Sequence, residues 1–351
     1  MPADVTSPVP PVPAHALGRG LLARLLAAGE QPVSGPELAE ALAVSRVAIK
    51  QTIDKLAGEG VPVGAVGRRG YRLTGEPEDW HPLLLGAWLD HRTRNATQPP
   101  PGLFFAEQVD STNTAAERLL AAGTPTPFAV VGGEQLAGRG RLGRRWQSRP
   151  GGNLYLTLAF RPPVNPRRIG LLTPWLGIAV CRFLARELEL EPNLKWPNDI
   201  LLGGRKTAGL LAEARIDSDL TREVIVGCGL NFRAPPGGWG DDLSAKATDL
   251  MAANGGKPVP AHRVTTGLIL ALIETMWLWE TGTSDHQLPI LWPVYDCLKG
   301  RRVHIETLGR NEAFMAVVED LAADGGLRVR REDGRVATVL AGDVTLAPGT
   351  L

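Results

Sequence analysis

Residues 138–146 read Gly-Arg-Gly-Arg-Leu-Gly-Arg-Arg-Trp and form the densest chemical feature of the chain; we call them the arginine loop. Its three glycines let the backbone approach a ligand or change conformation. Its four arginines repel one another unless an anion lies among them, and a guanidinium group matches two phosphate oxygens at once. Composition alone leaves two interpretations open, an anion-binding loop and a solvated basic loop or nucleic-acid arm. Trp146 favours an anchored loop end.

A second feature is Lys195-Trp196-Pro197-Asn198-Asp199, which lies between apolar residues. A lysine at this point could neutralise charge on a phosphoryl or acyl group during its transfer. The alternative is a surface turn held by a salt bridge.

Two weaker features follow apolar, strand-like runs. Asp110-Ser111-Thr112-Asn113 falls at a predicted strand-to-helix junction, where such side chains cap a helix or bind a polar ligand. In the second feature, Gly227-Cys228-Gly229-Leu230-Asn231, the glycines let a flat ring or a backbone come close. Neither feature is decisive alone.

Several common sites are not predicted. The stretch at 203–207 resembles the end of a phosphate-binding P-loop, but Arg205 stands where that motif needs glycine. The six histidines are far apart and no CxxC or HExxH motif occurs, so we expect no zinc hydrolase. No serine or cysteine triad signature is found.

The arginine loop belongs to a region, 102–296, in which strand-like and helical patterns alternate. Strands are predicted from residue 102 and at 128–132, 154–160, 200–202 and 224–226, and helices at 114–121, 169–188 and 263–280. This pattern predicts a mixed α/β domain.

Residues 17–75 predict a winged helix-turn-helix. Ser34 and Glu37 have capping-box spacing, and Ile49, Ile53 and Leu56 share one face of a third helix. The residues expected to face DNA are Ser45, Arg46, Lys50, Gln51, Arg68 and Arg69. Eight basic residues against five acidic ones predict moderate, salt-sensitive binding. The alternative is a packing module that does not bind DNA.

The other segments are shorter. Residues 1–16 are proline-rich and are predicted to be a disordered tail. Residues 76–101 are predicted to be a linker that contains one helix. Residues 297–351 contain five short, often β-branched runs separated by Gly/Asp turns, which predict a small β-barrel.

Length and composition agree with this division. A chain of 351 residues suggests two or three domains. With 38 basic and 37 acidic residues, the net charge of +1 gives no global attraction to nucleic acid or membrane. The three scattered cysteines argue for a reducing compartment. The longest apolar runs, 169–185 and 265–279, are shorter than the roughly 20 residues that span a bilayer, so we expect core helices of a cytoplasmic protein.

Taken together, these motifs resemble the biotin–protein ligases, with two additions: Lys206-x-Ala208-Gly209-Leu210-Leu211-x-Glu213, and Gly152-Asn153-Leu154 after the arginine loop. The N-terminal module makes the chain similar to the bifunctional form, which is both biotin operon repressor and biotin–[acetyl-CoA-carboxylase] ligase. The resemblance covers about 17–351. It implies an α+β multidomain fold: an N-terminal winged helix-turn-helix, a central mixed α/β ligase domain and a C-terminal SH3-like β-barrel.

The resemblance also implies a two-step reaction. The biotin carboxylate attacks the α-phosphate of Mg-ATP to give biotinyl-5′-adenylate, and a carrier-protein lysine then attacks this anhydride and releases AMP. The implied cofactors are ATP, biotin and Mg²⁺. The implied partners are a biotin carboxyl carrier protein, operator DNA and a second copy of the chain carrying the adenylate.

By the same resemblance, each role falls on numbered residues. Lys195 would bridge the biotin carboxylate and the α-phosphate, and Arg139 and Arg141 would complete the catalytic set. The implied biotin-binding residues are Ser111, Thr112, Asn113, Gln135, Arg139, Gly140, Arg141 and Lys195. The implied nucleotide-binding residues are Arg144, Lys206, Gly227, Gly229 and Asn231. The metal ligands are unassigned, and the adenine-stacking tryptophan of some members has no clear counterpart, since Trp239 does not align cleanly.

Three alternatives stay open beside this one. The first is a repressor that senses biotin but transfers it poorly, and the second is a monofunctional ligase with a vestigial winged helix. The third is a lipoate ligase, which shares the central fold but has a different arginine–glycine signature.

Overall fold

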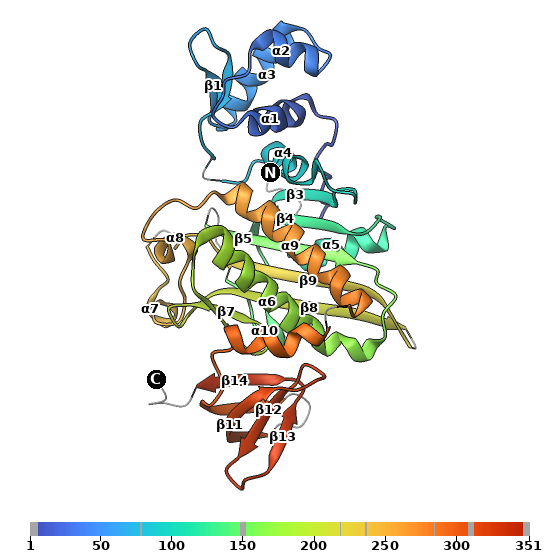
Figure 1. Cartoon of the computed structure of the whole chain (residues 1–351), viewed down its shortest axis with the longest axis vertical. Coiled ribbons are helices and arrows are strands. Elements are labelled where there is room, and N and C mark those ends of the chain that lie inside the picture. Colours follow the sequence, from blue (N-terminus) through green and yellow to red (C-terminus); the bar gives the residue numbers. More distant parts are fainter. Residues whose placement is uncertain are drawn as a thin grey trace.

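The computed structural model describes residues 6–77, 79–147, 152–217, 219–235, 237–283, 285–307 and 312–346. A small helical unit lies at one end, a seven-stranded sheet with its helices in the middle, and a five-stranded β unit at the other end (Figure 1). This arrangement agrees with the predicted α+β multidomain class.

The N-terminal unit is the predicted winged helix-turn-helix. Its elements are α1 (Leu17–Ala28), α2 (Gly35–Ala41), α3 (Arg46–Gly58), β1 (Val63–Ala65) and β2 (Tyr71–Leu73). The Ser34 hydroxyl accepts the Glu37 N–H at 3.3 Å, and the Ser45 hydroxyl accepts the Ala48 N–H at 3.1 Å. Both caps satisfy donors that the first helical turn leaves unpaired.

The segment predicted as a linker, 76–101, contains the predicted helix, and this helix packs in two cores. Its helix α4 (Pro82–Thr93) places Leu84 and Ala87 in the core of the winged helix and Leu85 and Leu89 in the core of the central domain. Because one helix supplies both cores, the two units share their packing along its whole length.

Polar contacts reinforce this joint. The Arg19 guanidinium donates to both Asp90 oxygens at 2.7 Å, passing so close to Gly86 that a Cβ there would lie 2.8 Å from Arg19 Cδ. On the other side, the His81 N–H donates to His262 Nε2 at 2.8 Å. The His262 N–H in turn donates to Glu76 at 2.8 Å.

Residues 6–16 are ordered against the central sheet, so the prediction of a disordered tail was wrong for them; residues 1–5 lie outside the described residues. The Val12 N–H donates to the Leu103 carbonyl at 2.8 Å, and the Phe105 N–H donates to the Pro10 carbonyl at 3.3 Å. Val9 and Val12 are buried in two different clusters. The proline-rich segment thus covers an exposed strand edge, a place where proline is tolerated.

The central sheet has the order β3-β4-β5-β9-β8-β7-β6. Its strands are β3 (Gly102–Val109), β4 (Phe128–Gln135), β5 (Asn153–Phe160), β6 (Pro192–Lys195), β7 (Asp199–Leu202), β8 (Arg205–Asp217) and β9 (Leu220–Asn231). Strands β3 and β4 pair in parallel, and the other neighbouring pairs of these strands are antiparallel. Strands β6 and β8 were not predicted.

Helices cover the two faces of this sheet unequally. The long helices α6 (Ile169–Leu188) and α9 (Ala261–Thr281) pack on one face, and α5 (Thr112–Ala121) packs on the other. The shorter helices are α7 (Asp241–Ser244), α8 (Leu250–Ala253) and α10 (Leu288–Tyr295), and there are 3-10 turns at Arg141–Gly143, Pro166–Arg168 and Asp285–Gln287. The face shared with α5 carries the site described below.

Helices α6 and α9 have 20 and 21 residues and are longer than the apolar runs 169–185 and 265–279 that predicted them. The stretch Pro166–Leu188 is long and apolar enough to cross a membrane by length and composition. It packs against α9 and strands β6–β8, which agrees with the predicted core role.

The C-terminal unit is a small antiparallel β domain, as predicted. Its strands are β10 (Arg302–Thr307), β11 (Ala313–Leu321), β12 (Leu327–Arg331), β13 (Val336–Val339) and β14 (Gly342–Leu346), in the order β13-β12-β11-β10-β14. The Trp196 indole N–H donates to the Gly325 carbonyl at 3.1 Å. This contact fixes the β domain against the β6–β7 hairpin.

Candidate active site

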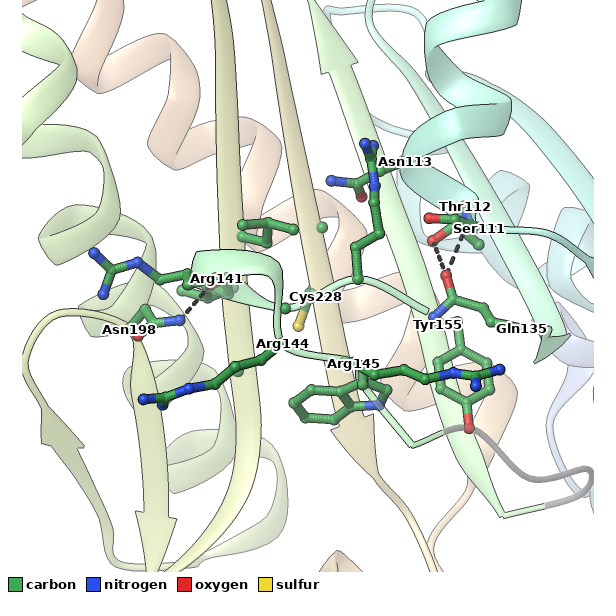
Figure 2. A pocket seen from close by; sticks show the side chains of 18 of the residues that line it. Ser111, Thr112, Asn113, Gln135, Arg141, Arg144, Arg145, Tyr155, Asn198 and Cys228 are labelled. Atoms are coloured by element: carbon green, nitrogen blue, oxygen red, sulfur yellow. Dashed lines mark hydrogen bonds between the residues drawn. The ribbon is translucent and has the colours of Figure 1, made fainter. Parts of the chain in front are cut away.

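A cavity of about 180 Å³ lies between the arginine loop and the α5 face of the sheet (Figure 2). Four parts of the chain form its wall: the start of α5, the arginine loop, strands β4, β5 and β7–β9, and the first residues of β14. It therefore brings together most of the residues that the sequence singled out.

One end of the cavity carries neutral polar groups. Gln135 at the end of β4 accepts hydrogen bonds from the Thr112 N–H at 2.8 Å and the Thr112 hydroxyl at 3.0 Å (Figure 2). Ser111 and Thr112 are buried. These groups are positioned before any ligand binds.

Asp110 fixes this end of α5. Burial alone would raise the pKa of its carboxyl, but hydrogen bonds from Arg118 and the Ser111 N–H hold the pKa below its ordinary value. The carboxylate therefore stays charged and holds the turn that presents Ser111.

Asn113 lines the cavity, and both ends of its amide are already engaged. Its oxygen lies 2.7 Å from the Thr157 hydroxyl, and its nitrogen donates to Glu213 at 2.6 Å. A Cβ at Gly227 would lie 2.5 Å from the Asn113 oxygen, so only glycine leaves room for this side chain.

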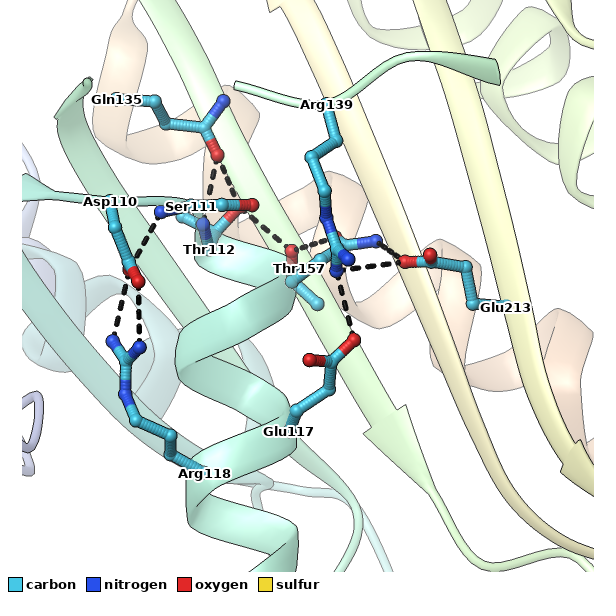
Figure 3. Close-up of polar contacts among 10 residues, drawn as sticks. Asp110, Ser111, Thr112, Glu117, Arg118, Gln135, Arg139, Thr157 and Glu213 are labelled. Carbon is cyan, nitrogen blue, oxygen red and sulfur yellow. Dashed lines mark hydrogen bonds and ion pairs between the residues drawn. The ribbon is translucent and has the colours of Figure 1, made fainter. Parts of the chain in front are cut away.

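The first arginine of the loop is held by two carboxylates (Figure 3). Arg139 lies 2.9 Å from Glu117 on α5 and 3.2 Å from Glu213 on β8. Burial tends to lower the Arg139 pKa, but the two carboxylates raise it overall.

Two other arginines of the loop, Arg141 and Arg144, reach the C-terminal β domain. Arg144 pairs with Asp343 at 2.5 Å, and the Arg141 guanidinium donates to the Gly342 carbonyl at 3.3 Å. The Asp343 carboxylate raises the pKa of Arg144, whereas burial lowers the pKa of Arg141. Asp343 lines the cavity and was not predicted, since it lies 199 residues from its partner in another domain.

Trp146 forms part of the floor. A Cβ at Gly229 would lie 2.7 Å from its ring and one at Gly209 would lie 2.9 Å from it, so the two glycines let the indole rest on the sheet. The Lys206 ammonium lies 5.3 Å from the ring centroid. The prediction that glycines here admit a flat ring agrees with this packing.

Lys206 lies in the cavity wall. Lys195 is not part of the wall, but it lies on β6 directly opposite the wall residue Asp199 of β7, so it shares a face of the sheet with that residue and its predicted role stays a prediction. Lys206 pairs with Asp199 at 2.5 Å. Both Asp199 and Asn198 belong to the wall, and neither had been assigned a role.

Asn231 is also outside the wall. Its side chain is buried and donates to the Thr248 carbonyl at 2.9 Å, which ties the end of β9 to the following loop. The predicted nucleotide contact at Asn231 stays a prediction, while Gly227 and Gly229 line the cavity.

Cys228 lines the cavity but is unsuited to nucleophilic chemistry. Burial raises the pKa of its thiol to about 12. The thiol is therefore neutral at physiological pH, and the site must act through its cations and hydrogen-bond donors.

The predicted DNA-facing side chains lie at the surface of the winged helix. Arg46, Lys50, Gln51, Arg68 and Arg69 are exposed. Lys50 is paired with Asp54 at 2.6 Å, and the Ser45 hydroxyl is used as the helix cap.

Comparison with known proteins places both modules. Residues 105–231 match the Biotin/lipoate A/B protein ligase family, and residues 19–72 match an HTH domain. The bifunctional ligase/repressor BirA of Bacillus subtilis (strain 168) is 30% identical over 330 residues, which cover 94% of this chain and 98% of that protein. The biotin--[acetyl-CoA-carboxylase] ligase of Mycobacterium tuberculosis is 30% identical over 242 residues, which cover 68% of this chain and 86% of that protein.

A solved structure shares the fold of most of this chain. The biotin protein ligase from Aquifex aeolicus in complex with biotin and ATP superposes with a TM-score of 0.56 at 27% identity, covering 70% of this chain and 98% of that one. Since the bifunctional relative aligns along nearly its whole length, the chain belongs to the biotin protein ligases, in the branch that joins a ligase to an HTH repressor module.

Proposed function

We propose that this protein is an ATP-dependent biotin–protein ligase that forms biotinyl-5′-AMP and transfers biotin to a lysine of a biotin carboxyl carrier protein. The observation that carries the proposal is the cavity itself, which has neutral hydrogen-bonding groups at one end and cations at the other. Biotin has the same division, with a neutral ureido ring and a carboxylate. In this assignment residues 17–75 bind DNA, residues 102–296 catalyse the ligation of biotin, and residues 297–351 form the small β domain.

The neutral end would hold the ureido ring. The Thr112 hydroxyl, the Gln135 amide and Ser111 offer donors and acceptors that are already positioned. Asn113 supports them from α5 through its fixed amide. Groups positioned before binding lose little conformational freedom when the ligand enters.

The cationic end would support the first chemical step. A biotin carboxylate oxygen attacks the α-phosphorus, and the bond from that phosphorus to pyrophosphate breaks. Two anions approach each other in this step, so a cation between them stabilises the transition state. We assign this bridge to Lys206, which would exchange Asp199 for the substrate oxygens.

Trp146 offers an aromatic face beside Lys206. A nucleotide base stacks well on such a ring. We therefore assign the adenine contact, which the sequence had left open, to Trp146.

The arginine loop would exclude water from the product. A mixed anhydride is lost if water reaches it, and a glycine-containing loop that closes over the ligand prevents this. The contacts of Arg141 and Arg144 with Gly342 and Asp343 show how the loop meets the β domain.

Mg²⁺ fits the donor set at this end. No group of three or more His, Cys, Asp or Glu side chains gathers among the described residues. Mg²⁺ bound to a nucleotide needs only one or two protein carboxylates besides the phosphates, and Asp199 with Asn198 supplies suitable oxygens. When bound, the ion would offset phosphate charge.

Transfer of label tests the ligase directly. The full chain is incubated with ATP, Mg²⁺, labelled biotin and a carrier domain, and we expect label on the carrier lysine. Labelled lipoate serves as the control and should not be transferred. Absence of label on the carrier would refute the ligase activity and favour a biotin-sensing repressor.

We also propose that the winged helix represses transcription in a cytoplasmic homodimer that carries the adenylate. The exposed Arg46, Gln51, Arg68 and Arg69 support DNA contact. A gel shift with DNA from upstream of biotin-synthesis genes should strengthen when biotin and ATP are added. No shift under either condition would indicate a vestigial module.

A further inference from the structure

Glu213 on β8 connects two walls of the cavity through a single oxygen atom. Its Oε2 accepts a hydrogen bond from Asn113 Nδ2 at 2.6 Å and from Arg139 Nη2 at 3.2 Å (Figure 3). Asn113 belongs to α5 and Arg139 to the arginine loop. One carboxylate therefore contacts both the neutral end of the site and the arginine loop that covers it.

Glu117 gives Arg139 a second hold. Its Oε1 accepts from the same guanidinium nitrogen at 2.9 Å. The exposed fractions of the Arg139, Glu117 and Glu213 side chains are 38%, 45% and 37%, so these ion pairs are accessible to water. Accessible ion pairs are weak enough for a competing anion to replace them.

We propose that Glu213 is a positioning residue for adenylate formation. In the free enzyme it holds Arg139 against α5 and β8, and it releases the guanidinium when the biotin carboxylate enters, while it keeps Asn113 in place. The inference rests on the proposed function and adds a residue to it. Because the hold stabilises the free enzyme, it lowers the apparent affinity for biotin.

Two substitutions at this position separate its two contacts. Glu213→Gln keeps an acceptor for Asn113 but removes the charge that holds Arg139, so the KM for biotin should fall about threefold, with kcat for adenylate formation within about twofold. Glu213→Ala removes both contacts and leaves the Asn113 amide without its acceptor, so the KM for biotin should rise about tenfold. A purely structural role would not give opposite signs.

Controls come from the same part of the fold. Glu223→Gln on β9 removes a carboxylate that pairs with Arg161 outside the cavity, and the KM for biotin should not change. In an Arg139→Gln background the effect of Glu213→Gln should disappear, because the two residues act through one contact. Glu117→Gln should lower the KM in the same direction as Glu213→Gln.

The measurement is steady-state pyrophosphate release by the full chain at varied biotin. A KM that rises or stays constant in Glu213→Gln overturns the inference, as does an undiminished effect in the Arg139→Gln background. These outcomes require an active wild-type enzyme. A wild type that transfers no label would instead refute the proposed ligase, so the two failures are distinguishable.

Discussion

The wing and the arginine loop both carry arginines, but those at the turn of the wing are exposed to solvent and two of those in the loop form ion pairs with carboxylates. Arg68 and Arg69 are exposed at the turn between β1 and β2, and no ion pair is found for them within the described parts of the chain. Arg139 and Arg144 are each paired with carboxylates of the protein. The wing is thus ready for a polyanion, whereas the loop must exchange one anion for another.

This difference affects how each region responds to salt. Exposed cations that meet DNA phosphates release counterions, so their affinity falls steeply with ionic strength. A loop cation that moves from a carboxylate to a ligand keeps the same charge balance before and after binding. Salt therefore acts on both of its states and changes the affinity less.

The largest effect is expected for Lys206, which tests the cations of the cavity that are paired with carboxylates. Lys206→Ala should lower the rate of adenylate formation on the order of 10²-fold, because one cation between two anions is lost. Lys195→Ala should lower it less, since Lys195 is not in the wall itself but lies opposite the wall residue Asp199. Pyrophosphate release measures both rates. A larger loss in Lys195→Ala would restore that residue as the bridge.

A substitution in the wing tests the exposed arginines. The double substitution Arg68→Ala and Arg69→Ala should weaken binding to duplex DNA by about thirtyfold and reduce the slope of log affinity against log salt by about 2. Fluorescence anisotropy at several KCl concentrations gives both values, and the KM for ATP of the same variant is the control. An unchanged slope would show that these arginines do not meet phosphates.

Trp146 is a further difference between the two regions, because the arginine loop ends in an aromatic ring beside a cation. Trp146→Ala should raise the KM for ATP about tenfold through loss of base stacking, and Trp146→Phe should recover part of the loss. Steady-state kinetics at saturating biotin measure this. A KM for ATP that is the same in all three proteins would place adenine elsewhere.

The smallest expected effect concerns the thiols. Burial raises the pKa of Cys181 and Cys228 to about 12, so both thiols stay neutral until the pH approaches that value. A thiol reagent at pH 8 should leave the activity of the native enzyme unchanged, and should react with both cysteines once guanidinium chloride unfolds the chain. Rapid inactivation of the native enzyme would contradict this burial.

Local signals in the sequence were enough for the winged helix, whereas the neutral end of the cavity was predicted from the family resemblance. The caps at Ser34 and Ser45 and the apolar face of α3 depend on residues within a few positions of one another. Thr112 and Gln135 were placed together by resemblance, and parallel strands β3 and β4 explain why they meet.

The position of Lys206 in the cavity wall could not be derived in this way. Strict alternation from Gly209 would place Lys206 on the opposite face of β8, because the two residues are three positions apart. The pairing of β7 with β8 skips Thr207, since Ile200 lies opposite Ala208 and Leu201 opposite Lys206. This β-bulge returns Lys206 to the cavity face, and a bulge leaves no reliable trace in the sequence.

Contacts between distant segments were equally hidden. Asp343 meets Arg144 only because the β domain is fixed beside the central sheet. Likewise, a proline-rich stretch has the composition of a tail, and only the free edge of β3 gives Val9 and Val12 a place to bury.

The shared helix α4 has a consequence for the history of this protein. Leu84 and Ala87 pack in one unit, and Leu85 and Leu89 pack in the other. Deletion of the DNA-binding module would therefore expose the apolar side chains of Leu84 and Ala87 on the remaining enzyme. A lineage that discarded repression would first have to make these positions polar. In this chain the two modules are therefore coupled physically, because one helix completes both of their cores.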